Sequence, residues 1–252
     1  MTNYPTDLSL SQWQVIKKYV CDQRKRKYSY QEIVNAILYL VKTGCQWRML
    51  PSEFPKWQTV YFYFSRWKRN GTFEQMHEQL VEKVRKQQKR NEQPTVGIID
   101  SQSVKTTLVA GEARGFDAGK KIKGRKRHII VDTLGLVLAV VIHSASIQDR
   151  NGADQVIRCM KESWHRIVKV FADGGYSGKL IERIKKALNI EVEIIKRNEA
   201  HRFKVLPKRW IVERTFAWLD TNRRNAKDYE RLTETSQAMI HLASIRIMLK
   251  KF

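Results

Sequence analysis

Val96-Gly97-Ile98-Ile99-Asp100-Ser101-Gln102-Ser103 is an apolar run that ends on a carboxylate and continues into small polar residues. Short β-rich runs bounded by turn residues are typical of buried strands, and Pro94 marks a point at which a strand can begin. The stretch therefore predicts a strand over residues 96–100 that delivers Asp100 to one edge of a sheet.

A second run repeats this design, with an apolar strand, an aspartate and then flexible glycines: Ile167-Val168-Lys169-Val170-Phe171-Ala172-Asp173-Gly174-Gly175-Tyr176. Two strands that each finish on Asp can place both carboxylates at one sheet end, where oxygen ligands suit Mg²⁺. For either Asp alone, a turn or a helix cap explains the residue equally well.

The segments around these two strands predict a mixed α/β sheet with helices packed on it. A hairpin with its turn near residues 133–135 joins strands 128–133 and 136–143. Further along, the pattern predicts a helix over 153–165, a strand over 167–172, a helix over 177–188 and a strand over 192–195. The expected sheet has five strands.

The first ninety residues have a different, all-helical pattern. Apolar residues recur at helical spacing in four segments, 10–19, 30–44, 58–69 and 72–84. Ser29 and Glu32 form a capping-box pattern before the second helix. A polar run to Gln93 has the composition of a linker, so we expect a helical domain over 1–90 and an α/β domain over 91–252.

The net charge of the chain predicts a polyanionic partner. In 252 residues, 48 Lys and Arg stand against 25 Asp and Glu, giving +23. Nucleic acid is the usual partner of such a protein, and a membrane surface is the second choice. No apolar stretch approaches the length of a spanning helix, the N-terminus lacks signal-peptide features, and the three cysteines lack metal-ligand spacing. We therefore expect a protein of the cytoplasm, associated with the nucleoid, with reduced cysteines.

Two basic segments are candidates for DNA contacts. The helix that ends at Arg66, Lys68 and Arg69 could lie in a DNA groove, although dimerisation is an equally natural use of its domain. The run from Lys120 to His128 holds Lys120, Lys121, Lys123, Arg125, Lys126 and Arg127. At the mouth of a sheet, these cations fit a phosphodiester backbone, with affinity that falls steeply with salt. The alternative for both segments is a solvated basic face.

A third acid, Glu213, lies on a helix that Pro207 can start from its first turn. Val212, Phe216 and Leu219 share one face of this helix, and Glu213 borders it. An isolated helical Glu is normally exposed to solvent. Glu213 is not isolated, because two other acids lie at or near the open end of the same predicted core. This grouping favours a functional role for Glu213.

Together, four blocks resemble the DDE transposases of bacterial insertion sequences, most closely the insertion sequence five family, whose catalytic domain is similar to that of Harbinger elements. The blocks are residues 96–101, the basic run 119–128, the turn 172–176 and the helix 210–219. The resemblance covers nearly the whole chain, because the helical segment also looks like that family's amino-terminal domain.

The resemblance implies an RNase H-like fold in which Asp100, Asp173 and Glu213 are the catalytic, metal-binding residues. It also implies double-stranded DNA as the partner, both as transposon ends and as target, and a homodimer on DNA. Relatives often carry Lys or Arg seven residues after the catalytic Glu, but here that position is Asp220. The nearest cations are Arg214, Arg223 and Arg224, which become candidate DNA contacts.

The expected chemistry is metal-assisted phosphoryl transfer. Two Mg²⁺ ions, or Mn²⁺ in their place, about 4 Å apart would activate the attacking oxygen and stabilise the leaving one. We expect Asp100 to bind both ions, Asp173 to bind one of them and Glu213 to bind the other. His128 and His143 flank basic or apolar strands, so core or phosphate-contact roles are expected for them.

Two other functions share parts of this pattern. An RNase H-like structure-selective nuclease would have the acids and the charge but would not transfer strands. A domesticated DNA-binding regulator would keep the basic surface without catalysis, although the intact set of acids argues against such decay.

Overall fold

The computed structural model describes residues 4–20, 27–108, 111, 113–195 and 209–252. By packing, the chain divides into two compact units. The first comprises Met1–Leu80, Leu219–Ala226 and Ala238–Phe252, and the second comprises Val81–Trp218 and Lys227–Gln237. The functional division at residue 90 that the sequence suggests stays a prediction.

The first unit is helical, as predicted. Its helices include α1 (Leu10–Val20), α2 (Tyr30–Thr43) and α3 (Trp57–Arg69), together with the first part of α4 (Thr72–Gln87) and the last part of α8 (Thr233–Leu249). A short 3-10 turn, η1 (Trp47–Met49), precedes α3. The capping box of Ser29 and Glu32 is formed, and Gly44 ends α2 in the left-handed conformation with φ 73°. Sequence patterning did not reveal α8.

The described part of the second unit contains a six-stranded sheet. The strands are β1 (Val96–Lys105), β2 (Gly115–Asp117), β3 (Ile122–Val131), β4 (Val137–Ser144), β5 (Lys169–Ala172) and β6 (Glu191–Ile194). β3 pairs antiparallel with β1 and β4, while β1, β5 and β6 run parallel. The main order is therefore β4-β3-β1-β5-β6, with the short β2 beside the first residues of β3. This mixed sheet with its helices confirms the predicted α/β class, and it has one strand more than the five expected, the short β2.

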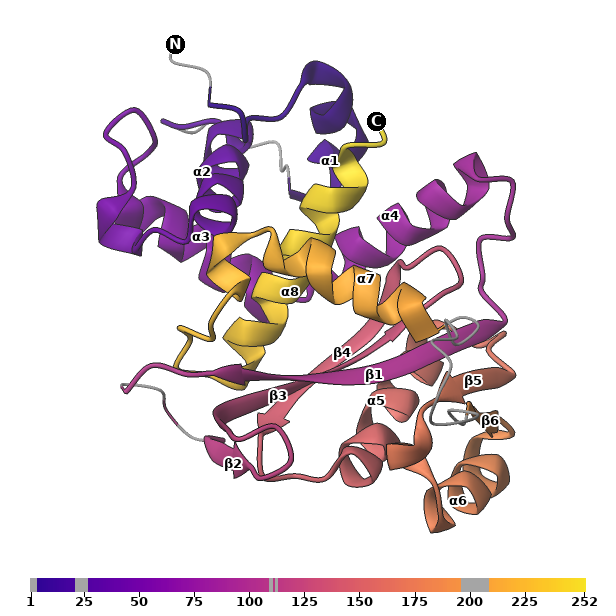
Figure 1. Ribbon diagram of the computed structural model, residues 1–252. Coiled ribbons are helices and arrows are strands. Elements are labelled where there is room, and N and C mark those ends of the chain that lie inside the picture. Colours follow the sequence, from indigo (N-terminus) through magenta and orange to yellow (C-terminus); the bar gives the residue numbers. More distant parts are fainter. Residues whose placement is uncertain (1–3, 21–26, 109–110, 112, 196–208) are drawn as a thin grey trace. The chain divides into compact units, whose positions relative to one another are not determined.

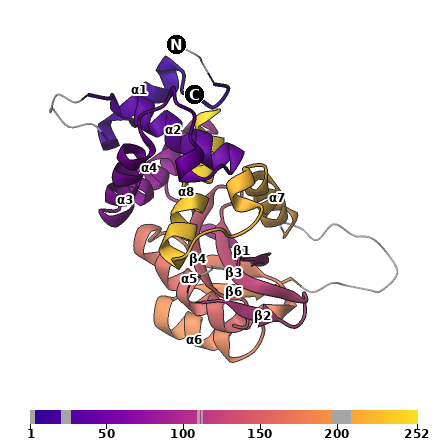
Figure 2. The same cartoon turned by 90° about the vertical axis from the view of Figure 1, so that its left-hand side faces the viewer.

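Helices of the same unit pack on this sheet (Figures 1 and 2). On one face, α5 (Asp149–Ser163) packs on β3 and β4, and α6 (Lys179–Leu188) packs on α5 and β6. Trp164, fully buried after α5, donates its indole N–H to the carbonyl of Leu138 at 2.9 Å. α7 (Arg209–Asp220) approaches the β3–β4 turn, where the Thr215 hydroxyl donates to the carbonyl of Gly135 at 2.9 Å.

Two strands are longer than the sequence predicted. β1 continues through Gln102 and Ser103 to Lys105, and β3 begins at Ile122 instead of His128. The reason is cross-strand pairing, since the polar end of β1 pairs with the basic residues from Gly124 to His128. The basic run is thus part of the sheet. A side chain on Gly124 would collide with the carbonyl of Val104, so glycine permits this close approach.

Ordinary apolar burial supports the sheet. Ile98, Ile129, Ile130 and Val140 are at most 1% exposed, as are Val156, Ile157 and Met160 on the facing helix. No helix in the described ranges has the length and apolar character needed to cross a membrane. The predicted first turn at Pro207 and the reduced state of Cys21 lie outside the described residues, while Cys45 is a free thiol.

Candidate active site

Sheet register brings the first two predicted acids to the same edge. β1 and β5 run parallel, and Ile98 pairs with Phe171. Asp100 follows Ile98 by two residues and Asp173 follows Phe171 by two, so Asp100, in the middle of β1, lies level with Asp173, just past the end of β5. The two acids are neighbours, as the repeated sequence runs predicted, but β1 does not end at Asp100.

Asp100 is half-buried and strongly perturbed. Burial is the main reason that its pKa rises to about 6, and the charge of Asp173 raises that pKa further. A hydrogen bond from the Ser101 backbone N–H, at 2.7 Å, and the charges of Lys120 and Arg209 act in the opposite direction. A carboxyl group with such a perturbed pKa at a sheet edge is a functional-site candidate.

Asp173 is fixed by the turn that follows it. Its carboxylate accepts the Gly175 backbone N–H at 2.9 Å and so caps the short helical turn η2 (Gly174–Tyr176). The next side chain, Tyr176, is 1% exposed. Burial raises the pKa of Tyr176 well above its usual value, and the charges of Asp100, Asp149 and Asp173 raise it further. Tyr176 therefore lies among the acids of this edge.

Glu213 comes from α7 and is held by its neighbour one turn earlier. Arg209 donates to the same carboxylate oxygen of Glu213 from Nη2 at 2.6 Å and from Nε at 3.0 Å. The Glu213 side chain is 49% exposed. Arg209 also interacts electrostatically with Asp100 and Asp173, which helps to raise the pKa of Arg209.

The donors at this edge are of the right type for a hard divalent cation, which prefers carboxylate oxygens. Their arrangement is incomplete, because Arg209 engages Glu213. Among the residues that the structure describes, no three histidine, cysteine or carboxylate side chains are gathered closely enough to hold one metal ion. Asp100 and Asp173 are thus neighbours, whereas the carboxylate of Glu213 is bound to Arg209.

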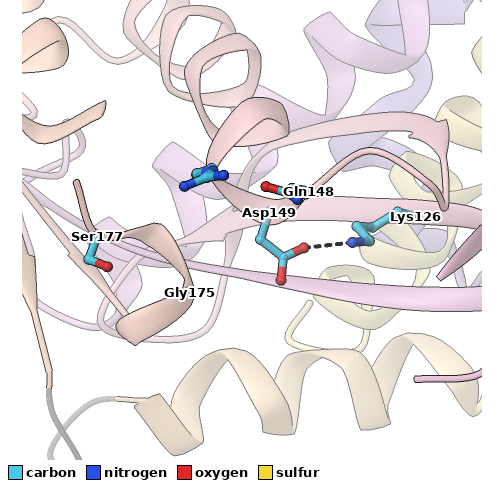
Figure 3. A pocket seen from close by; sticks show the side chains of 6 residues that line it. Lys126, Gln148, Asp149, Gly175 and Ser177 are labelled. Carbon is cyan, nitrogen blue, oxygen red and sulfur yellow. Dashed lines mark ion pairs between the residues drawn. The ribbon is translucent and has the colours of Figure 1, made fainter. Parts of the chain in front are cut away.

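Asp149 is a fourth acid that the sequence prediction missed. It accepts hydrogen bonds from the Ser101 hydroxyl and from Lys126 Nζ, both at 2.9 Å. With Lys126, Gln148, Arg150, Gly175 and Ser177 it lines an open cavity of about 390 Å³ (Figure 3). A signal existed, since Asp149 follows β4, and β4 runs in the same direction as β1 because both are antiparallel to β3.

The six cations of the run 120–127 have unequal surroundings. Lys120, Lys121 and Lys123 are exposed, and Lys120 Nζ donates to the carbonyl of Ser101 at 3.0 Å, beside Asp100. The other three, Arg125, Lys126 and Arg127, are at most 5% exposed. Arg125 donates to the carbonyls of Glu230 and Arg231, and Arg127 donates to the Gln102 amide. In this structure, these three groups have internal partners where the sequence suggested DNA contacts.

The remaining candidate cations are distributed over both units. Arg66 and Arg69 are exposed on α3, and Lys68 is partly exposed. Arg214 stacks between Trp210 and Trp218, with its guanidinium carbon 4.5 and 4.4 Å from the two ring centres. Arg223 is exposed, whereas Arg224 is 8% exposed and donates to the carbonyl of Cys45 at 3.1 Å.

His128 and His143 form a buried pair, with Nδ1 of His128 and Nε2 of His143 2.7 Å apart. Both are at most 7% exposed. Burial lowers the pKa of each ring, to about 3 for His128. The expected core role of these residues agrees with this geometry.

Comparison with known protein families identifies the family of this chain. The sequence pattern described as "Transposase DDE domain" matches residues 91–248, which is more than half of the chain. The chain belongs to the transposase DDE domain family. Residues 8–77 match a second pattern, described as a putative transposase of the IS4/5 family. The predicted family resemblance is confirmed, in both the α/β and the helical segment of this DDE-family chain.

A curated relative of this DDE-family chain is a putative transposase for insertion sequence element IS402 of Burkholderia cepacia. It is 32% identical over 126 residues, which cover 47% of this chain and 60% of the relative. The matched part is therefore less than two thirds of the relative's length.

Solved structures with distant similarity include two transposase complexes. The Mos1 strand transfer complex has 11% identity and a TM-score of 0.33, covering 91% of this chain and 79% of that one. The Drosophila P element transposase strand transfer complex has 11% identity and a TM-score of 0.36, covering 75% of this chain and 45% of that one.

Proposed function

We propose that this chain is a DNA transposase that binds the terminal inverted repeats of its insertion sequence and catalyses DNA cleavage and strand transfer. The observation that carries the proposal is the register that brings Asp100 and Asp173 level at one sheet edge. Glu213, on a helix of the same unit, supplies the third acid of a DDE-family chain.

The three acids would hold the divalent metal ions that the DDE family normally uses, and we propose two Mg²⁺. When bound, such ions activate an attacking oxygen and stabilise the leaving oxygen at phosphorus. The protein itself contributes position and charge, which carry most of phosphoryl-transfer catalysis. Asp100 is suited to a shared ligand because Asp173 lies beside it and Arg209 links that pair electrostatically to Glu213.

Basic groups around the acids are suited to DNA phosphates. Lys120 is anchored on the Ser101 carbonyl beside Asp100, so its charge lies where a phosphate would approach the acids. Lys121 and Lys123 extend this positive charge along the exposed hairpin. We propose these three side chains as contacts of the catalytic unit with DNA.

The helical unit offers a second DNA surface on α3. Val60, Phe64 and Trp67 are buried on one side of this helix, while Arg66 and Arg69 are exposed on another. A helix anchored by aromatic packing with a free basic side is suited to a DNA groove. We propose that this surface binds the transposon ends and that two copies of the protein assemble on paired ends.

The test is a cleavage and joining assay with purified protein, DNA that carries the ends of its element, and a target plasmid. With Mg²⁺ or Mn²⁺ we expect free 3′-hydroxyl ends and their covalent joining to the plasmid. Cleavage without joining would favour a nuclease. Specific binding without either reaction would favour a DNA-binding regulator.

A further inference from the structure

Arg209 has an unusual position for a surface arginine. Its guanidinium makes two contacts to one oxygen of Glu213, at 2.6 and 3.0 Å, and its side chain is only 26% exposed. Charge-assisted contacts of this kind are strong and directional. The oxygen of Glu213 that would face a cation is therefore already occupied.

The guanidinium of Arg209 also interacts electrostatically with Asp100 and Asp173. The hydrogen bond to Glu213 is the main reason that the pKa of Arg209 is raised, and the charges of Asp100 and Asp173 raise it further. In return, Arg209 counteracts the rise in the pKa of Asp100. One positive group thus interacts with all three carboxylates of the candidate site.

Three acids at one edge repel one another unless a cation lies among them. Arginine is suited to that position, because its guanidinium stays charged and presents several donors in a fixed plane. It uses the carboxylate lone pairs that a metal ion would need. Two donors of Arg209 already occupy Oε1 of Glu213, so a divalent cation that binds this oxygen has to displace at least one of them.

We propose that Arg209 is an internal counter-ion that competes with divalent metal for Glu213. The proposal rests on the function proposed above and adds a mechanism that regulates metal binding at the same site. In the free protein, Arg209 neutralises the acids and keeps Glu213 from completing the metal site. Glu213 becomes able to bind metal when the guanidinium of Arg209 pairs with another anion. A phosphate of bound DNA is an anion that arginine binds well.

The test measures Mn²⁺ binding to the full chain without DNA, by calorimetry and by the electron paramagnetic resonance of free Mn²⁺. Arg209→Gln removes the competitor, so we expect Mn²⁺ to bind at least about threefold more tightly, after allowing for the screening of partly exposed charges. Arg209→Lys keeps the charge without the planar fork and should give an intermediate affinity.

Arg158→Gln is the matched control. Arg158 makes the same type of contact one helical turn from its partner, with Nε 2.9 Å from Asp154 on α5. This variant loses the same charge away from the three acids and should bind Mn²⁺ like the wild type. In a Glu213→Gln background, Arg209→Gln should tighten Mn²⁺ binding much less, because the carboxylate for which the two cations compete is gone and only the interaction of Arg209 with Asp100 and Asp173 remains.

The proposal is overturned if Arg209→Gln binds Mn²⁺ no more tightly than the wild type. It is also overturned if Arg158→Gln tightens binding equally, or if the full effect of Arg209→Gln persists without Glu213. Thermal unfolding of each variant, with and without Mn²⁺, identifies any loss of folding. If Arg209 and Mn²⁺ compete as expected but the protein does not cleave DNA, only the transposase function is contradicted. If the protein cleaves DNA but Arg209 and Mn²⁺ do not compete, only the proposed role of Arg209 is contradicted.

Discussion

Gly152 lies in the first turns of α5 against the buried His128 and His143 rings. A β-carbon built at this position lies 2.6 Å from Cε1 of His128 and even closer to His143. Both rings are enclosed between β3, β4 and α5 and cannot move away easily. The identity of this residue is therefore set by packing and not by helix propensity.

For Gly152→Ala we predict destabilisation. At most helical positions this change would stabilise by up to about 1 kcal/mol, but here overpacking should reduce the free energy of unfolding by about 1–3 kcal/mol. Urea unfolding measures the difference. Gly174→Ala is the control, because its β-carbon meets nothing within 4 Å. An unchanged or raised stability of Gly152→Ala would contradict the packing described here.

The same histidine pair predicts a dependence of stability on pH. An imidazole in the unfolded chain titrates near 6.5, whereas burial lowers the pKa of His128 to about 3 and also lowers that of His143. As the pH falls below about 6.5, the unfolded chain binds protons that the folded chain does not. The contribution of the pair is thus complete above pH 6.5 and is lost progressively below it.

We predict that the difference in melting temperature between pH 7.5 and pH 5 is larger for the wild type than for His128→Gln/His143→Gln, which cannot titrate there. The comparison of the two proteins is decisive, because Asp100, with its raised pKa, acts in the opposite direction in this window. Equal pH dependence of the two proteins would contradict the buried, neutral state of the pair.

At the scale of elements, β3 shows where sequence patterning was sufficient and where it was not. The apolar half from Ile129 to Val131 was predicted as a strand. The basic half was expected at the mouth of the sheet, because charge normally indicates exposure. Pairing with the polar end of β1 extends the strand, and internal partners such as Asp149 for Lys126 make burial of its cations possible.

This difference predicts separable effects of changes at the two ends of the basic run from Lys120 to Arg127. Lys121→Gln/Lys123→Gln should weaken DNA binding and lower the salt slope by about 2, since each phosphate contact contributes about 0.9, with no change in melting temperature. Lys126→Ala should instead lower the melting temperature, because it leaves Asp149 and Asp117 without their shared cation. Anisotropy titrations at several salt concentrations and thermal unfolding measure both. A lower melting temperature for Lys121→Gln/Lys123→Gln, together with weaker DNA binding but unchanged stability for Lys126→Ala, would contradict these roles.

For α3, the prediction concerns binding of the transposon ends. Arg66→Ala/Arg69→Ala should reduce affinity for the element's ends more than about tenfold at moderate salt. Lys17→Ala/Lys18→Ala on α1 removes the same charge from another exposed basic site of the helical unit. Equal losses for both pairs would indicate a general charge effect and not a surface on α3.

At the scale of the whole molecule, local patterns predicted most of the helices and strands, although not β2 or α8, but they did not predict which segments pack together. Residues 219–226 and 238–252 belong to the helical unit, although they follow the α/β segment in sequence. Long-range packing of this kind leaves no periodic signal. Asp100 and Asp173 were predicted because each ends or follows a predicted strand, and Glu213 because the helix around it matches a family pattern. Asp149 and Arg209 depend on strand direction and side-chain geometry, which a single sequence does not give.

The central claim is that Asp100, Asp173 and Glu213 act as one catalytic set on DNA. The most direct measurement compares cleavage and joining of the element's ends by Asp100→Asn, Asp173→Asn and Glu213→Gln, with end binding measured on the same preparations. Glu182→Gln, an exposed glutamate on α6, is the control for loss of one charge. We predict that each of the three variants loses about a hundredfold or more of both reactions, while DNA binding and the control stay unchanged. Wild-type rates in any one of the three, at preserved folding, would contradict the claim.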